Sequence, residues 1–180
     1  MISIKFRYVL GIDPSGNYYE GKGTTGWCLF DCANNKIADI GTISSKDYNT
    51  QYHYWKAHLI LIYNYVNSFL KDKVAVSMED YRLYASKANN QINSKFETVQ
   101  LIGIIKYWCI SNNVTLKMRL ATAAKTRFTD EYLVKKHYIQ KQKKSYFCNA
   151  KLEALATHER DALRHALYFY YFENGGREYW

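Results

Sequence analysis

Three carboxylates and one histidine are spaced in a way that suits chemistry on phosphate groups. Asp13 and Glu79 each end a short apolar run, and Asp161 follows His158 by three residues, so both project from one face if the segment is helical. Taken singly, a carboxylate at a strand end is ordinary turn chemistry, and an acid in the first turn of a helix is favoured by the helix dipole. Taken together in a basic protein, the carboxylates predict a two-cation site that hydrolyses phosphodiester bonds.

The first part of the chain predicts the strands that would carry two of these acids. Residues 7–12, 25–31 and 36–44 have strand patterns, with a tight turn at Asn34 and Asn35, and form a three-stranded antiparallel meander. Residues 51–71 have helical spacing, and residues 74–79 are a short apolar strand. A helix between two strands of one sheet makes the later strand parallel to a neighbour. We therefore expect Asp13 and Glu79 at the same edge of the sheet.

The second part of the chain completes an α/β fold. Ser94 and Glu97 match a capping box before a helix at residues 95–111, residues 114–120 form a fifth strand, and a last helix starts near Thr157 and ends before Gly175. The length fits one domain, residues 1–180. The predicted architecture is a five-stranded mixed sheet, with the meander joined by parallel strands and flanked by helices.

The charge of the chain favours a polyanionic partner. Lys and Arg number 25 against 16 Asp and Glu, for a net charge of +9 and a pI near 9.3. Much of the excess lies between residues 117 and 144. A charge run is commonly just a solvated face, but this one includes Lys135 and Lys136, which we expect to contact DNA phosphates.

Several classes of protein are disfavoured. The four cysteines form no CxxC pair and the five histidines complete no zinc pattern, so we expect reduced, mostly buried cysteines. No export signal or membrane span is evident, which predicts a cytoplasmic protein. The hairpin around Asp13 also suits actin-like ATPases and sugar kinases, but 180 residues with nine glycines leave no room for their second phosphate loop, so no nucleotide cofactor is expected.

The motifs together resemble the RuvC-type Holliday junction resolvases of the RNase H-like nuclease and integrase superfamily. The resemblance runs from Val9 to about Phe172 and rests on the segments 11–14 (GIDP), 25–27 (TGW), 158–163 (HERDAL) and the strand ending in Glu79. It implies an RNase H-like fold and a crossover junction endonuclease that makes paired, symmetric nicks with 5′-phosphate and 3′-hydroxyl ends. The loop at residues 17–23 is longer than the family's usual first hairpin.

The resemblance also implies a set of site residues. Two Mg²⁺ or Mn²⁺ ions would be held by Asp13, Glu79 and Asp161, with His158 as a fourth ligand or as the group that orients the attacking water. Lys125 falls about where the family has a lysine near the scissile phosphate. The polar loop after Glu79, where the family commonly has an aromatic wedge, offers the DNA contacts Tyr81, Arg82, Tyr84 and Lys87. His165 takes a place that is usually apolar in the family, so we expect it to take no part.

A four-way junction has approximate two-fold symmetry, so the expected assembly is a homodimer. The helix at residues 95–111, with Ile104 and Trp108 on a second apolar face, is the candidate dimer surface, although burial within the monomer explains that pattern equally well. Two alternatives to strict junction resolution stay open, namely a broader fork and flap nuclease and a non-catalytic junction-binding protein. Richness in Tyr, Asn, Lys and Ile suggests an A/T-rich bacterial or phage genome.

Overall fold

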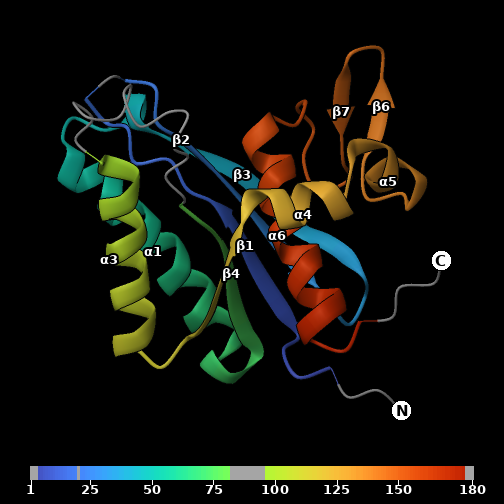
Figure 1. The fold of residues 1–180 in the computed structure, drawn as a ribbon, viewed down its shortest axis with the longest axis horizontal. Helices are drawn as coiled ribbons and strands as arrows, with labels where there is room; N and C mark the ends of the chain where they lie inside the picture. Colours follow the sequence, from blue (N-terminus) through green and yellow to red (C-terminus); the bar gives the residue numbers. More distant parts are fainter. Residues whose placement is uncertain (1–3, 20, 82–95, 177–180) are drawn as a thin grey trace.

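A computed structural model describes residues 4–19, 21–81 and 96–176. Its centre is a five-stranded sheet in the order β3-β2-β1-β4-β5 (Figure 1). The strands are β1 (Tyr8–Asp13), β2 (Thr24–Asp31), β3 (Lys36–Ser44), β4 (Val74–Asp80) and β5 (Thr115–Leu120). β1 pairs with β2, and β2 with β3, in antiparallel fashion, whereas β4 is parallel to both β1 and β5. The meander and the parallel strands are arranged as the sequence predicts.

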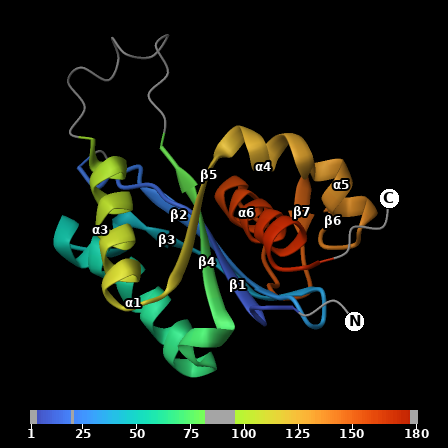
Figure 2. The same ribbon diagram turned by 60° about the horizontal axis from the view of Figure 1, so that its bottom comes forward.

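Helices cover both faces of this sheet (Figure 2). α1 (Gln51–Phe69) and α3 (Glu97–Ser111) lie on one face, and α6 (Thr157–Glu173) lies on the other. Short 3₁₀ turns flank α1, at Ser45–Asp47 and Lys71–Lys73. Each face has its own cluster of buried apolar side chains, so the sheet is covered by a core on either side.

α1 forms for local reasons that the sequence contains. The hydroxyl of its N-cap residue Thr50 accepts a hydrogen bond from the backbone N–H of His53, which satisfies one of the donors left free at the helix start. Tyr54, His58, Ile62 and Val66 recur at four-residue spacing and are buried against the sheet. The helix stops at Leu70, whose φ of +72° lies outside helical geometry.

α6 is the most deeply buried helix of the described chain, because nearly every residue from Glu159 to Tyr170 is removed from solvent. The carboxylate of Glu159 accepts a hydrogen bond of 2.6 Å from the backbone N–H of Ala156 and so caps the helix start. The ammonium of Lys151 lies 2.7 Å from the same carboxylate and offsets its charge. A buried acid thereby becomes compatible with the core.

The basic segment between β5 and α6 has more structure than the sequence predicts. It forms α4 (Ala121–Arg127), α5 (Asp130–Lys135) and a hairpin of β6 (Gln140–Gln142) and β7 (Ser145–Phe147). The four cysteines are free and buried, as expected. Within the described ranges, no helix is long and apolar enough to cross a membrane.

Candidate active site

Asp13 and Glu79 meet at one edge of the sheet because their strands are parallel neighbours. Ile12 is paired with Met78 in the β1–β4 ladder, so the residues that follow, Asp13 and Glu79, leave the ladder side by side. Asp13 is buried, and Glu79 is half-buried. The edge is therefore a place where two carboxylates are fixed by backbone pairing and only partly hydrated.

Two glycines bring the start of α6 onto this edge. A Cβ at Gly11 in β1 would overlap the carbonyl oxygen of Ala162, and a Cβ at Gly26 in β2 would overlap the backbone of His158. Only glycine lets helix and sheet approach so closely. Each strand therefore has no side chain at the point where it contacts the start of α6. This contact carries His158 and Asp161 to the end of β1.

Asp13 is held between a cationic and an anionic neighbour. Nδ1 of His158 lies 2.5 Å from Oδ2 of Asp13, and the carboxylate of Glu79 also interacts with Asp13. Burial raises the pKa of Asp13 to about 6, with Glu79 adding to the rise and His158 opposing it. The contact with Asp13 raises the pKa of His158 against the effect of its own burial. Asp13 and His158 thus form a close hydrogen-bonded pair, in which each partner shifts the pKa of the other toward the charged form.

Glu79 faces His165, which was expected to take no part in the active site. His165 is buried, and its Nε2 lies 3.7 Å from Oε2 of Glu79. Burial alone would raise the pKa of Glu79, but the nearby His165 ring and Asp13 outweigh it, so that this pKa is lowered. The His165 side chain therefore lies at the acidic edge, although it was expected to take no part in the site. The signal in the sequence was its spacing of four residues from Asp161, which places both side chains on one side of a helix.

Asp13, Glu79 and His165 form a group that could hold a metal ion, because one ligand atom from each lies within 4.8 Å of the others. Carboxylate oxygens and imidazole nitrogens are both common ligands of divalent metals. Nδ1 of His165 is buried and has no hydrogen-bond partner among the described residues. Asp13 and Glu79 are close together and partly shielded from water, and the His165 ring beside them has one nitrogen without a hydrogen-bond partner among the described residues. A bound cation would stabilise this set of ligands.

Asp161 is buried beside this group and is bound by two cations of the protein. The ammonium of Lys125 on α4 lies 2.8 Å from its Oδ2, and Arg164 is paired with its Oδ1. Arg164 is itself buried and also donates to the backbone carbonyl of Phe128 and to the carboxylate of Asp130. The charge of Asp161 can therefore be buried in the fold, because each of its oxygens has a cationic partner.

Lys125 connects α4 to all three acids. Its burial lowers the pKa of the ammonium, but the contact with Asp161 and the fields of Asp13 and Glu79 raise it overall. The side chain is about half exposed, so the charge is available both to the protein and to a ligand at the edge. The structure thus brings the predicted residues Asp13, Glu79, His158, Asp161 and Lys125 into one neighbourhood.

A hydrogen-bonded chain fixes the loop that follows Asp13. The hydroxyl of Thr25 accepts from the backbone N–H of Ser15 at 2.9 Å and lies 2.8 Å from Nε2 of His58. Nδ1–H of His58 donates to the carbonyl of Tyr54, so Nε2 of the neutral ring is the acceptor for Thr25. Burial lowers the pKa of His58 to about 4, which keeps the ring neutral at ordinary pH.

The same loop is tied to the start of α3. The carboxylate of Glu97 accepts hydrogen bonds from the backbone N–H groups of Tyr18, at 2.6 Å, and Tyr19, at 3.4 Å. The N-cap of α3 is Phe96, in a left-handed conformation, without a side-chain cap. The capping-box role predicted for Glu97 is therefore wrong, because the acid serves the loop instead; Ser94 lies outside the described residues.

Of the remaining predicted DNA contacts, the structure describes Tyr81, Lys135 and Lys136. Tyr81 is half-buried and packs against the apolar cluster beneath α1 and α3. Lys135 ends α5 and is exposed, and Lys136 follows it with its ammonium 5.8 Å from the ring centroid of Tyr132. Arg82, Tyr84 and Lys87 fall outside the described residues.

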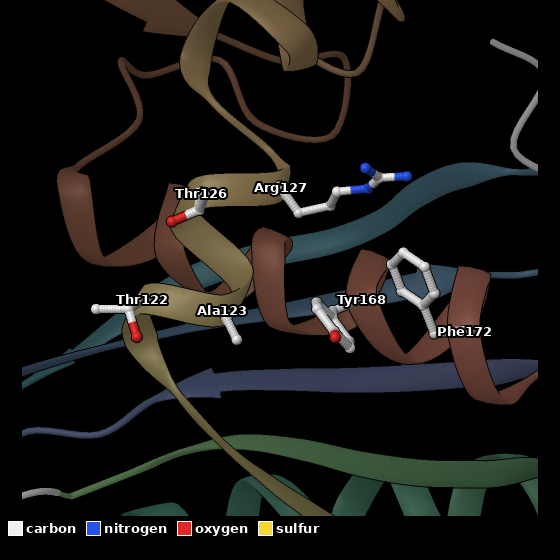
Figure 3. A pocket seen from close by; sticks show the side chains of 6 residues that line it. All are labelled: Thr122, Ala123, Thr126, Arg127, Tyr168 and Phe172. Atoms are coloured by element: carbon white, nitrogen blue, oxygen red, sulfur yellow. The ribbon is translucent and has the colours of Figure 1, made fainter.

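The surface also has grooves that are separate from the acidic edge. One of about 660 Å³ lies between α4 and α6 (Figure 3), lined by Thr122, Ala123, Thr126, Arg127, Tyr168 and Phe172. It contains no carboxylate or histidine and so has no set of metal ligands. Another, of about 370 Å³ between α1 and α3, is lined mainly by apolar and aromatic side chains, including Ile104 and Trp108.

Two solved structures share the fold. T. thermophilus RuvC in complex with a Holliday junction substrate has 13% sequence identity and a TM-score of 0.61, and the match covers 89% of this chain and 90% of that chain. A second Thermus thermophilus RuvC structure has 14% identity and a TM-score of 0.56, covering 89% of this chain and 91% of that one. No protein-family model and no curated protein matches the chain. The likeness shows a RuvC-type, RNase H-like fold, as the sequence predicts.

Proposed function

We propose that the protein is a metal-dependent endonuclease that resolves four-way DNA junctions by paired, symmetric nicks. The observation that carries this proposal is the convergence of Asp13, Glu79 and Asp161 at one edge of a RuvC-type sheet, in a chain of net charge +9. A solved structure of the same fold, RuvC, is bound to a Holliday junction substrate. Cut strands would carry 5′-phosphate and 3′-hydroxyl ends.

Asp13, Glu79 and Asp161 would hold two Mg²⁺ or Mn²⁺ ions, and His165 is a further candidate ligand. The bound ions would lower the pKa of the attacking water and stabilise the leaving oxygen. The support lies in the protein itself, where the described residues that offset these acidic charges are His158, Lys125, Arg164 and, near Glu79, His165. A cation would relieve the repulsion between Asp13 and Glu79 that their burial creates.

His158 is assigned to the attacking water rather than to the metal. Its Nδ1 is engaged by Asp13, and the half-exposed ring keeps Nε2 for a water or a phosphate oxygen. Its raised pKa suits a group that holds a proton while a nearby phosphate passes through its charged transition state. Lys125, about half exposed beside Asp161, would contact the scissile phosphate.

A homodimer would present two such sites to the two opposed strands of a junction. The helix predicted for this contact, α3, exposes Val99, Tyr107 and Ile110, and its Ile104 and Trp108 line the groove together with residues of α1 that include Ile60 and Tyr63. Such an apolar face, next to a groove of about 370 Å³, is typical of protein interfaces. We place the dimer contact on the α1 and α3 face, opposite α6.

DNA outside the cut would be held by cations and aromatic residues near the edge. Lys135, Lys136 and Tyr81 are the described candidates, and Arg82, Tyr84 and Lys87 complete the set proposed from the sequence. Phosphate contacts of this kind position DNA without reading sequence. A fork and flap nuclease would use the same acids, so only substrate choice separates it from a resolvase.

The test is cleavage of a labelled synthetic four-way junction, beside linear duplex, a fork and a flap, with Mg²⁺ or Mn²⁺. Wild type should nick the junction symmetrically, and Asp13→Asn, Glu79→Gln and Asp161→Asn should bind it but not cut. Equal cutting of all branched substrates would widen the function to a general branch nuclease. Tight binding without cutting, in wild type and under either metal, would favour a non-catalytic junction-binding protein.

A further inference from the structure

The hairpin of β6 and β7 stands outside the main sheet but is anchored in the core (Figure 1). The residues at its two ends, Ile139 and Cys148, are buried in the cluster under α6. The backbone N–H of Leu155 donates to the carbonyl of Tyr146 at 2.7 Å, and the guanidinium of Arg160 lies 4.5 Å from the Tyr146 ring centroid. Because Arg160 neighbours Asp161 on α6, the direction of the hairpin is set relative to the acidic edge.

The end of α5 and the hairpin are rich in lysine, and the turn of the hairpin is their most positive part, because Asp130 and Glu131 line a groove together with Lys135 and Lys141. Residues 135–144 contain five lysines and no acidic residue. Lys143 and Lys144 form the turn between the strands, and both are exposed. In the described part of the chain neither of them forms an ion pair. Fixed, unneutralised cations at a projecting tip are the electrostatic pattern of phosphate recognition.

The turn itself uses a residue that its backbone disfavours. Lys143 has a φ of +56°, in the left-handed region where glycine and asparagine are the favoured residues of tight hairpin turns. A lysine there gives up stability that Asn or Gly would supply. Positions that break a local rule in this way are commonly functional, and here the side chain gained is a second tip cation.

We propose that the tip of this hairpin, Lys143 and Lys144, together with Lys141 of β6, binds the phosphate backbone of a duplex DNA arm. A two-stranded ribbon is narrow enough to follow the major groove of B-form DNA, and the lysines would hold its phosphates without reading bases. The proposal rests on the proposed function in so far as it takes DNA to be the substrate. It assigns the hairpin to an arm, away from the cut.

The first test measures the salt dependence of DNA binding. The experiment uses the Asp13→Asn protein, which should bind DNA without cutting it. Fluorescence anisotropy with a labelled junction and a labelled duplex then gives the slope of log affinity against log salt concentration. Replacing Lys141, Lys143 and Lys144 by Gln should reduce that slope by about 2 to 3, since each phosphate contact contributes about 0.9. The matched control replaces three exposed lysines elsewhere, at positions 5, 46 and 73, for the same change of net charge, and should leave the slope near that of the background.

Two outcomes would overturn the assignment. An unchanged slope in the hairpin variant would remove the tip from the DNA contact. An equal fall in the control would mean that total charge, and not the hairpin, sets affinity. Failure of the proposed function is distinct, because it appears as wild-type protein that neither prefers nor cuts junctions, whereas the hairpin variant would still lose affinity for duplex.

A single substitution separates the DNA contact from a merely structural turn. Lys143→Gly should raise Tm by roughly 2 to 4 °C, because the left-handed strain is relieved, and should lower the salt slope by about 0.9. For this variant, the Tm should rise while the affinity for DNA falls. A higher Tm with unchanged DNA binding would show that Lys143 does not contact DNA.

Discussion

Replacing Asp13 by Asn should make the metal-free protein more stable above neutral pH. The carboxylate is buried, and its pKa is raised from 3.8 to about 6. A raised pKa means that the folded state holds a proton that the unfolded state has lost between these values, so stability falls as pH rises from about 4 to 6. Above pH 6 the folded protein carries the full cost of the buried charge.

The size of the effect follows from the shift. About two pKa units, at about 1.4 kcal/mol each, give an upper limit near 3 kcal/mol at pH 8 and less than about 1 kcal/mol at pH 4. For a chain of 180 residues this corresponds to roughly 5 to 10 °C in Tm. Asn keeps the shape of the side chain and removes the charge that Glu79 opposes.

Thermal unfolding of both proteins at pH 4 and pH 8, with chelator and then with Mn²⁺, measures the effect. Metal should raise the Tm of wild type strongly and that of Asp13→Asn weakly, because the variant lacks a ligand. Asp72→Asn is the control, since this aspartate is exposed and pairs only with the exposed Lys73 in the described structure. It should change neither Tm nor the response to metal.

Two results would contradict this reasoning. A lower Tm for metal-free Asp13→Asn at pH 8 would show that the Asp13 carboxylate stabilises the fold. It would contradict a net cost of burying this charge next to Glu79. An equal gain at pH 4 and pH 8 would show that the effect is not electrostatic, because at pH 4 the folded state holds Asp13 protonated and most of the charge cost is absent.

Three further substitutions test other contacts of the site. Asp161→Asn should lower stability by about 1 to 3 kcal/mol in denaturant unfolding, because the buried Arg164 loses a charged partner, whereas exposed Glu153→Gln should be neutral. Gly26→Ala should cost about 1 to 3 kcal/mol and reduce cleavage, since its Cβ would displace the backbone of His158; normal stability and cutting would contradict the seating of α6. His58→Gln should reduce the loss of stability as pH falls from 6.5 to 4. The reason is that the buried His58, whose pKa is lowered to about 4, favours the folded state only while it is neutral. An unchanged dependence of stability on pH would contradict this role of His58.

Strand ends and the start of the last helix could be read from the sequence because they depend on local patterns. Alternating or continuous apolar runs predicted β1 and β4, so the meeting of Asp13 and Glu79 followed from the crossover rule alone. The predicted spacing of His158 and Asp161 also holds, because both lie near the start of α6, three residues apart.

The rest depended on tertiary contacts that leave little local signal. His165 is one polar residue on a buried helix, and only packing of α6 on β4 shows that it faces Glu79. Glu97 fits a capping box by spacing, yet a loop distant in the chain takes its carboxylate. α4, α5 and the hairpin are too short for periodicity to detect, and the turn at Lys143 lacks the usual Asn or Gly.

The most direct test of a resolvase is whether both opposed strands are cut in one encounter. A supercoiled plasmid that extrudes a cruciform distinguishes the outcomes, because two symmetric nicks linearise it and a single nick relaxes it. Wild type with Mg²⁺ or Mn²⁺ should yield linear plasmid, and Glu79→Gln should leave it supercoiled. Nicked circles alone, or cutting that persists in Glu79→Gln, would contradict paired cleavage by the acidic edge.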